Sequence, residues 1–207
     1  DVLNRAKLEE FAKTLREHYK SVGRYNAKVD PIVTTLPNNR AEITLQIDED
    51  DTAKLRSVTF NGNEAISSSK LQEQMELQPD SWWKLWGNKF DGSQFDKDVQ
   101  AIQDYYQNNG YAKARVTKTD VQLNEEHTKA DVTIDVSEGE KYNLSSARIV
   151  GNLGGMADEL QPLLGELHLN DTFSRADVQN VESLIKDKLG ERGYGSATVN
   201  TVPTFDD

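Results

Sequence analysis

The sequence predicts an α+β protein built from tandem copies of one unit, in the order strand, helix, helix, strand, strand. Three observations predict it: a glycine-aromatic motif that recurs, a helical apolar stripe before each motif, and alternating sequence after it. The motif glycines are Gly23, Gly110 and Gly193, which stand 87 and 83 residues apart. We therefore expect a repeat of about 85 residues.

Each long helix is predicted from apolar residues spaced three and four apart, which place one face of a helix on a core. We expect Asn4, Ser93 and Ser174 to cap the starts of these helices. The motif glycines follow their ends, where a left-handed residue is common. The stripes are Leu8, Phe11, Leu15, Tyr19 and Val22; Phe95, Val99, Ile102 and Tyr106; and Val178, Val181, Ile185 and Leu189.

The strands are predicted from period-two alternation and from turn residues at their ends. In each unit the first strand should run parallel to the third and antiparallel to the second, which lies at an edge. The two helices should cover one face of this mixed three-stranded sheet. Short helices are expected at 68–77 and 156–167, the latter broken at Pro162. The predicted strands are 27–35, 41–47, 57–61, 112–123, 130–136, 147–150 and 197–204.

The three units are not equally complete. Residues 1–50 read as the second half of a unit, residues 51–139 as a whole unit, and residues 140–207 as a unit without its last strand. Two and a half repeats of small units fit the polar composition, because hydrophobic residues are only 36% of the chain.

Composition excludes several classes of protein. A net charge of −11 argues against a nucleic-acid partner, because such modules need a basic face. No apolar run is long enough for a membrane-spanning helix. The chain has no cysteine, so it has neither disulfides nor thiolate metal sites. Because it begins at Asp1 without a signal sequence, we expect a mature form or a fragment.

The sequence gives little support for catalysis. His18, His127 and His168 fall at unrelated positions of different units, and none has a second ligand at metal spacing. The glycine-rich run at 151–155 lacks the full dinucleotide-binding pattern. We expect no catalytic residue, no metal and no cofactor, although an unrelated α+β enzyme fragment stays an alternative.

Several short motifs follow one another in a specific order along the chain: Ser21–Tyr25, Thr35–Arg40, Phe60–Asn63, Trp82–Trp83, Tyr105–Ala112, Val136–Gly139, Val150–Gly154 and Gly193–Tyr194. Taken in this order, they resemble the POTRA (polypeptide-transport-associated) family over the whole chain. The resemblance is strongest to its members in outer-membrane barrel assembly. It implies the second half of POTRA 2, all of POTRA 3 and most of POTRA 4.

The resemblance implies a non-catalytic scaffold on the periplasmic side of the bacterial outer membrane. Expected partners are the lipoprotein BamB, other assembly-machine lipoproteins and unfolded outer-membrane proteins. The full-length protein would be embedded in the membrane by a β-barrel that is absent from this sequence, and a native homo-oligomer is not expected. The alternative is the POTRA array of a two-partner-secretion transporter or an autotransporter assembly factor.

The candidate binding site is the edge strand of the complete unit, because an exposed edge can accept an extended peptide as a further strand. The resemblance places BamB at the far end of this strand, also by edge pairing. The alternative is that its two apolar residues, Val121 and Leu123, only cover the core or a hinge. The site residues are Arg115, Thr117, Thr119, Val121 and Leu123.

Two further segments carry interpretations that the sequence leaves open. Asp48, Glu49, Asp50 and Asp51 join the first two units, either as a plain solvated linker or as a hinge that sets their angle. The tryptophans fall in a loop between helices, where they either plug the core or form an aromatic contact surface. They are Trp82, Trp83 and Trp86.

Overall fold

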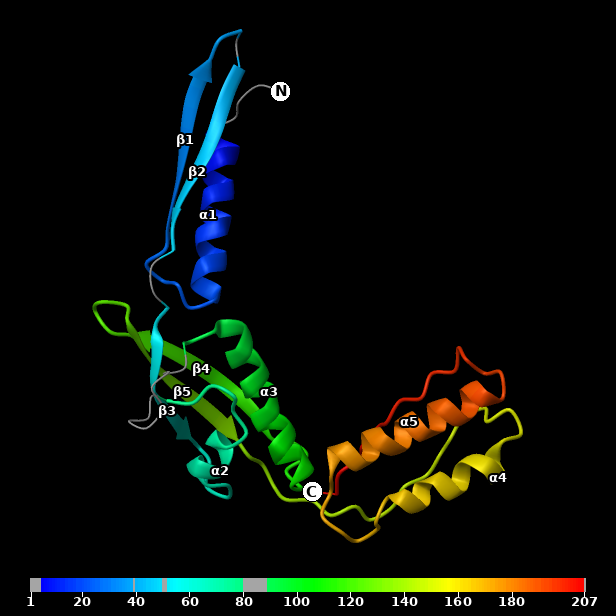
Figure 1. Ribbon diagram of the computed structural model, residues 1–207. Coiled ribbons are helices and arrows are strands. Elements are labelled where there is room, and N and C mark those ends of the chain that lie inside the picture. Colours follow the sequence, from blue (N-terminus) through cyan, green and yellow to red (C-terminus); the bar gives the residue numbers. More distant parts are fainter. Residues whose placement is uncertain (1–4, 39, 50–51, 80–88, 207) are drawn as a thin grey trace. The chain divides into compact units, whose positions relative to one another are not determined.

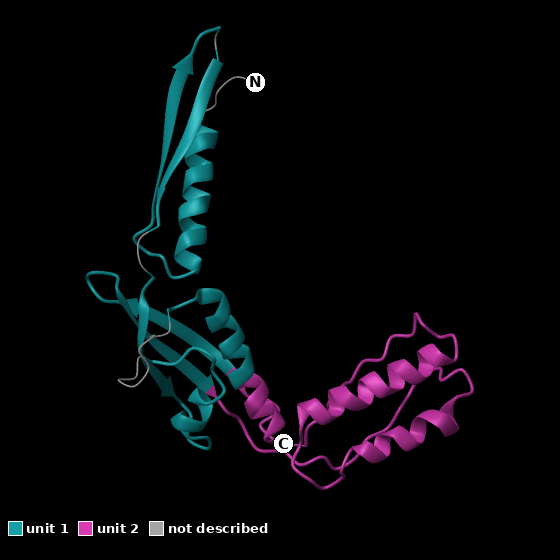
Figure 2. Ribbon diagram, in the orientation of Figure 1, with its two compact units in different colours: residues 1–102, 116–136 teal, residues 103–115, 137–207 magenta. Residues whose placement is uncertain are grey.

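The computed structural model describes residues 5–38, 40–49, 52–79 and 89–206. The chain forms two compact units, which Figure 2 shows in different colours. The first contains residues 1–102 and 116–136, and the second contains residues 103–115 and 137–207.

The first unit begins with a helix and a hairpin, as the sequence predicts for the second half of a repeat. Helix α1 (Arg5–Ser21) lies along strands β1 (Lys28–Leu36) and β2 (Arg40–Asp48) in Figure 1. The two strands are antiparallel over their full length. The Arg16 guanidinium donates two hydrogen bonds to the carbonyl of Val29, of 3.3 and 3.0 Å, and ties the helix to β1.

A three-stranded sheet follows, with β5 between β3 and β4. Its strands are β3 (Lys54–Asn61), β4 (Arg115–Leu123) and β5 (Lys129–Ser137). Strand β3 is parallel to β5, and the short turn between β4 and β5 makes that pair antiparallel. The predicted mixed sheet, with its second strand at an edge, is confirmed.

The core of this repeat lies between the sheet and two helices on one face, α2 (Ser68–Gln72) and α3 (Gly92–Asn108). Strand β5 alternates along its length, because its even-numbered residues are buried and its odd-numbered residues are partly exposed. The buried set on β5 is Ala130, Val132, Ile134 and Val136.

The predicted helix caps fare differently. Ser174 is confirmed, because its hydroxyl accepts a hydrogen bond from the backbone of Asp177 at 3.3 Å. The prediction that Ser93 caps α3 is wrong. The carboxylate of Asp91 caps this helix instead, because it accepts hydrogen bonds from the backbone N–H groups of Ser93 and Gln94. Asn4 lies outside the described residues. The motif glycines all have positive φ, as expected.

The second unit contains α4 (Ala157–Leu160), the 3₁₀ helix η1 (Gln161–Glu166) and α5 (Arg175–Glu191). The change from α to 3₁₀ falls next to Pro162, where the sequence predicts a break. The strands predicted at 147–150 and 197–204 are wrong, because the structure describes both segments as irregular.

The missing strands have a structural reason. In the complete repeat, β3 and β4 do not pair with each other, since β5 lies between them. The equivalent segments near 147–150 and 197–204 have no described strand between them, so they lack ladder partners. Val150 and Val202 are accordingly 75% and 81% exposed. The core here is a smaller cluster of Met156, Leu160, Leu167, Val181 and Ile185.

Candidate functional site

Strand β4 is the candidate binding element, because it is one of the two outer strands of the three-stranded sheet. It is nine residues long, so its outer side presents a row of backbone groups that β5 does not reach. An extended peptide could pair with these groups irrespective of its side chains.

The predicted site residues differ in exposure. Arg115, Thr117 and Thr119 are exposed, whereas Val121 and Leu123 are partly buried. The hydroxyl of Thr117 donates to the carbonyl of Asp135 at 3.1 Å, so this side chain is turned toward β5. The first half of β4 is therefore the more accessible part of the edge.

Both ends of β4 are fixed by polar side chains. Before the strand, the carboxamide of Gln107 donates to the carbonyl of Ala114 at 3.4 Å. After it, the carboxamide oxygen of Asn124 accepts from the backbone of Thr128 and Lys129, at 2.8 Å each. The bonds of Asn124 stabilise the turn between β4 and β5, and the bond of Gln107 anchors the residue before β4.

The other edge strand, β3, is linked to β5 by an ion pair between side chains. The guanidinium of Arg56 forms a bidentate ion pair with Asp131, and the Ser57 hydroxyl donates to the same carboxylate. The hydrogen bonds from Arg56 and Ser57 lower the pKa of Asp131 to about 2. Cross-strand pairs of this kind help to fix register.

A buried carboxylate that sequence reasoning missed lies beneath the sheet. Asp98 of α3 is 2% exposed and accepts backbone hydrogen bonds from Glu76 and Leu77, each of 2.9 Å. The carboxamide of Gln94 donates to it at 3.0 Å. The available signal was its position three residues after Phe95, on the apolar face of the helix. These hydrogen bonds tie α3 to the segment that contains Glu76 and Leu77.

The first joint between repeats is made by three backbone groups. The N–H of Ala53, just before β3, donates to the carbonyl of Gly23 at 3.0 Å. The carbonyl of Ala53 in turn accepts from the N–H of Phe90 at 2.7 Å. A Cβ on Gly23 would lie 1.9 Å from the Phe90 carbonyl oxygen, so only glycine fits here.

The second joint repeats this arrangement one period later. The N–H of Tyr142 donates to the carbonyl of Gly110 at 2.9 Å, and the carbonyl of Tyr142 accepts from Phe173 at 3.0 Å. The same three positions of the repeat are therefore used twice. The glycine at this position therefore has two roles: it follows the end of a helix, and its carbonyl accepts a hydrogen bond from the first residues of the next repeat.

The second joint has additional side-chain bonds. The Arg175 guanidinium donates to the carboxamide oxygen of Gln107 at 2.5 Å. The side-chain oxygen of Asn108 accepts from the backbone of Ala176 at 2.9 Å, near the start of α5. Tyr106, at the end of α3, donates to Glu138 at 2.8 Å. Burial and this hydrogen bond raise the pKa of Tyr106.

Two of the remaining predictions concern residues that lie partly or wholly outside the described ones. Of the acidic run, Asp48 ends β2 and Glu49 accepts from the Tyr19 hydroxyl at 3.0 Å, whereas Asp50 and Asp51 are not described. The hydrogen bond to Glu49 raises the pKa of Tyr19. All three tryptophans lie in residues 80–88, which are also outside the described part.

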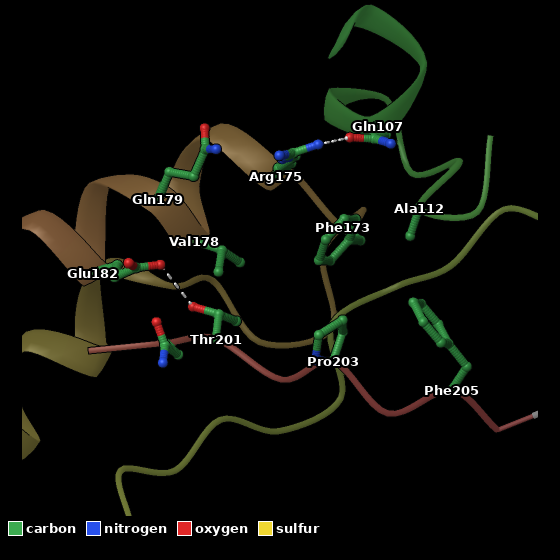
Figure 3. Close-up of a pocket in the computed structure, with 11 residues that line it drawn as sticks. Gln107, Ala112, Phe173, Arg175, Val178, Gln179, Glu182, Thr201, Pro203 and Phe205 are labelled. Carbon is green, nitrogen blue, oxygen red and sulfur yellow. Dashed lines mark hydrogen bonds between the residues drawn. The ribbon is translucent and has the colours of Figure 1, made fainter. Parts of the chain in front are cut away.

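A pocket of about 400 Å³ opens in the second unit, beside α5 and the segment 200–205 (Figure 3). Phe173 and Val178 line it with apolar surface, and Thr201 donates to Glu182 at 3.2 Å along its wall. By repeat position, these walls correspond to α3 and β4 of the complete repeat.

Within the described ranges, no group of three or more histidine and acidic side chains is arranged to hold a metal ion. Among those same residues, no helix is both long and apolar enough to cross a bilayer.

Comparison with known proteins places the chain in a family. The POTRA family model, described as a surface antigen variable number repeat, matches residues 1–50, 53–139 and 142–207. Outer membrane protein assembly factor BamA of Neisseria meningitidis is 33% identical over 97% of the chain, and that of Buchnera aphidicola is 27% identical over 95%. The chain spans only 25% and 32% of the lengths of these relatives.

A solved structure adds support at higher identity. The crystal structure of Haemophilus influenzae BamA POTRA3-5 is 74% identical, with a TM-score of 0.68. The match covers 75% of this chain and 61% of that one. Repeat pattern, sheet topology and family match agree, and the chain belongs to the POTRA family.

Proposed function

We propose that this chain is part of a periplasmic scaffold for outer-membrane protein assembly. The family match and the names of the relatives support this role. We also propose that the units have the boundaries 1–50, 51–139 and 140–207. We propose that this role is non-catalytic, which the same family membership supports.

The proposed mechanism is addition of an extended segment to β4. The observation that carries it is the position of β4 at an outer edge, with β5 on its other side. The proposed ligands are unfolded outer-membrane proteins and accessory lipoproteins, BamB among them. Because backbone groups supply the hydrogen bonds, one edge can serve many β-strand clients.

Proline substitutions on β4 test this mechanism. Backbone N–H groups along a strand point alternately to its two sides, so Lys118→Pro and Thr119→Pro form a matched pair. One of these two substitutions removes a backbone N–H that faces away from β5 and is available to an added strand. The other removes an N–H that takes part in the hydrogen bonds between β4 and β5. Val121→Pro extends the test toward the far end of the strand.

The expected result is that one of the pair keeps the fold, by circular dichroism, and loses affinity for purified BamB in a calorimetric titration. Undiminished affinity in every folded variant would contradict edge addition. Recovery of assembly lipoproteins by affinity capture from a periplasmic extract tests the wider scaffold role separately.

The acidic run and the tryptophan cluster stay predictions. We propose that Asp48–Asp51 act as a hinge between the first two repeats, and solution scattering on a longer chain would show whether the angle varies. We propose that Trp82, Trp83 and Trp86 form an aromatic contact surface. Indole emission at buried wavelengths in the free protein would contradict it.

A further inference from the structure

The first half of β4 is a basic stretch in an acidic protein. The chain carries 35 acidic residues among 207, yet none lies from Tyr105 through Thr119. Three cations fall within this stretch: Lys113, Arg115 and Lys118. Two of them, Arg115 and Lys118, belong to the strand itself.

The side chains of both strand cations are exposed, and within the described residues neither side chain has a hydrogen bond or ion pair. Arg56 on the other edge strand differs, because its guanidinium is held by Asp131 of β5. Strand β4 thus presents free positive charge at the same edge that presents free backbone groups.

Strand geometry determines where an added strand would place its side chains. Successive residues point to opposite faces, so Arg115 and Lys118, three apart, lie on opposite faces of the sheet. Directly opposed residues of a paired strand come within about 5 Å of each other, where opposite charges attract. We infer that β4 selects extended segments that carry Asp or Glu on both faces, over neutral and basic ones. This inference rests on the edge addition proposed above.

Edge lysines have a second known use, which is to discourage a free edge from pairing with other chains. The two roles predict different behaviour. Selective recognition predicts a preference among peptides that follows their charge. Protection of the edge predicts self-association once the cations are removed, with no such preference.

The experiment uses three nine-residue peptides in which single valines alternate with adjacent pairs of one other residue type. This residue is glutamate in the first peptide, glutamine in the second and lysine in the third. Because adjacent residues of a strand point to opposite faces, each pair places one side chain on either face. Binding to the full chain is measured by calorimetry at low salt. We expect the acidic peptide to bind about threefold to tenfold more tightly than the glutamine peptide, and the basic one more weakly. The difference should shrink at 0.5 M salt, because exposed charges are screened.

The double variant Arg115→Gln/Lys118→Gln should bind the three peptides about equally. Its matched control is Lys54→Gln/Lys97→Gln, which removes two exposed cations from the same repeat but not from β4. The control should keep the preference for the acidic peptide. Sedimentation velocity on both variants reports self-association.

The outcomes separate the two proposals. Equal binding of all three peptides by the unaltered chain overturns the charge preference and leaves edge addition standing. No binding of any peptide overturns both. Self-association of the β4 double variant, with an unchanged preference for the acidic peptide, assigns the cations to protection of the edge and overturns the inference.

Discussion

The second repeat and the third, which the family model matches at residues 53–139 and 142–207, share one apolar pattern but differ in their strands. Helices α3 and α5 are both 17 residues long, and each is followed two residues later by a glycine with positive φ. The second repeat has a sheet in which Ile134 is fully buried, whereas the equivalent region of the third is irregular. A helix satisfies its hydrogen bonds internally, but a strand needs a neighbour, and the described part of the third repeat contains no central strand.

The strongest test of this comparison is to supply the strand. Asp207 corresponds to Asn124 by repeat position, so appending a copy of residues 125–137 places a β5-like strand in register. We expect residues near 147–150 and 197–204 to become strands on either side of it. This is the largest expected effect, because it reorganises a whole repeat, and far-ultraviolet circular dichroism and hydrogen exchange would measure it.

Its control is the same extension with the counterparts of Val132 and Ile134 changed to Asp. That strand keeps its backbone groups but cannot enter an apolar core, so no protection should appear. Equal protection in both versions would mean that backbone pairing alone orders the segment. No gain from the unaltered copy would contradict the explanation given for the missing strands.

This contrast also shows what sequence could predict. The long helices and their glycine ends were predictable, because their signals are local. The strands at 147–150 and 197–204 alternate as real strands do, but pairing is decided by residues far along the chain. The position of β4 at the edge was predictable from the direction in which the chain runs through each strand. The buried position of Asp98 was missed because its backbone partners lie about 21 residues away in the sequence.

The second expected effect compares a buried strand residue with an exposed one. Ile134→Ala should destabilise the second repeat by about 3 kcal/mol, because it removes a buried side chain from the middle of β5. Val202→Ala in the third repeat should change stability by less than about 0.5 kcal/mol, since Val202 is 81% exposed. Urea unfolding followed by tryptophan fluorescence reports the second repeat, because all tryptophans lie there, and far-ultraviolet circular dichroism reports the helices of the third repeat as well. Similar losses of stability from the two substitutions would contradict the proposed difference between a buried strand in the second repeat and an exposed segment in the third.

The third effect concerns a difference within the helices. Asp98 of α3 is matched in α5 by Val181, which is 3% exposed and has no polar role. Asp98→Ala should cost about 2 kcal/mol, because the N–H groups of Glu76 and Leu77 lose their buried acceptor. The exposed neighbour Asp96 is the control, and Asp96→Ala should be nearly neutral. Equal effects in urea unfolding would show that the buried carboxylate is dispensable.

The smallest effect is a pH dependence that comes from the ion pair between β3 and β5 of the second repeat. Asp131, with its pKa lowered to about 2 by Arg56 and Ser57, favours the folded state at pH above about 4. This stabilisation is lost as the pH falls from about 4 to 2, because the proton then displaces the ion pair. The Arg56 side chain is exposed and that of Asp131 is partly exposed, so solvent screening should keep the contribution of the pair small.

Arg56→Gln removes the cation, and the stability difference from the unaltered chain should therefore be present at pH 5 and vanish near pH 2. Carboxyl NMR titration should show the Asp131 midpoint rising toward its ordinary value near 3.9 in this variant. The third repeat has Ser145 where the second has Arg56, and so carries no equivalent pair. An unchanged midpoint would mean that Ser57 alone lowers the pKa, and the cross-strand ion pair would then not distinguish the two repeats.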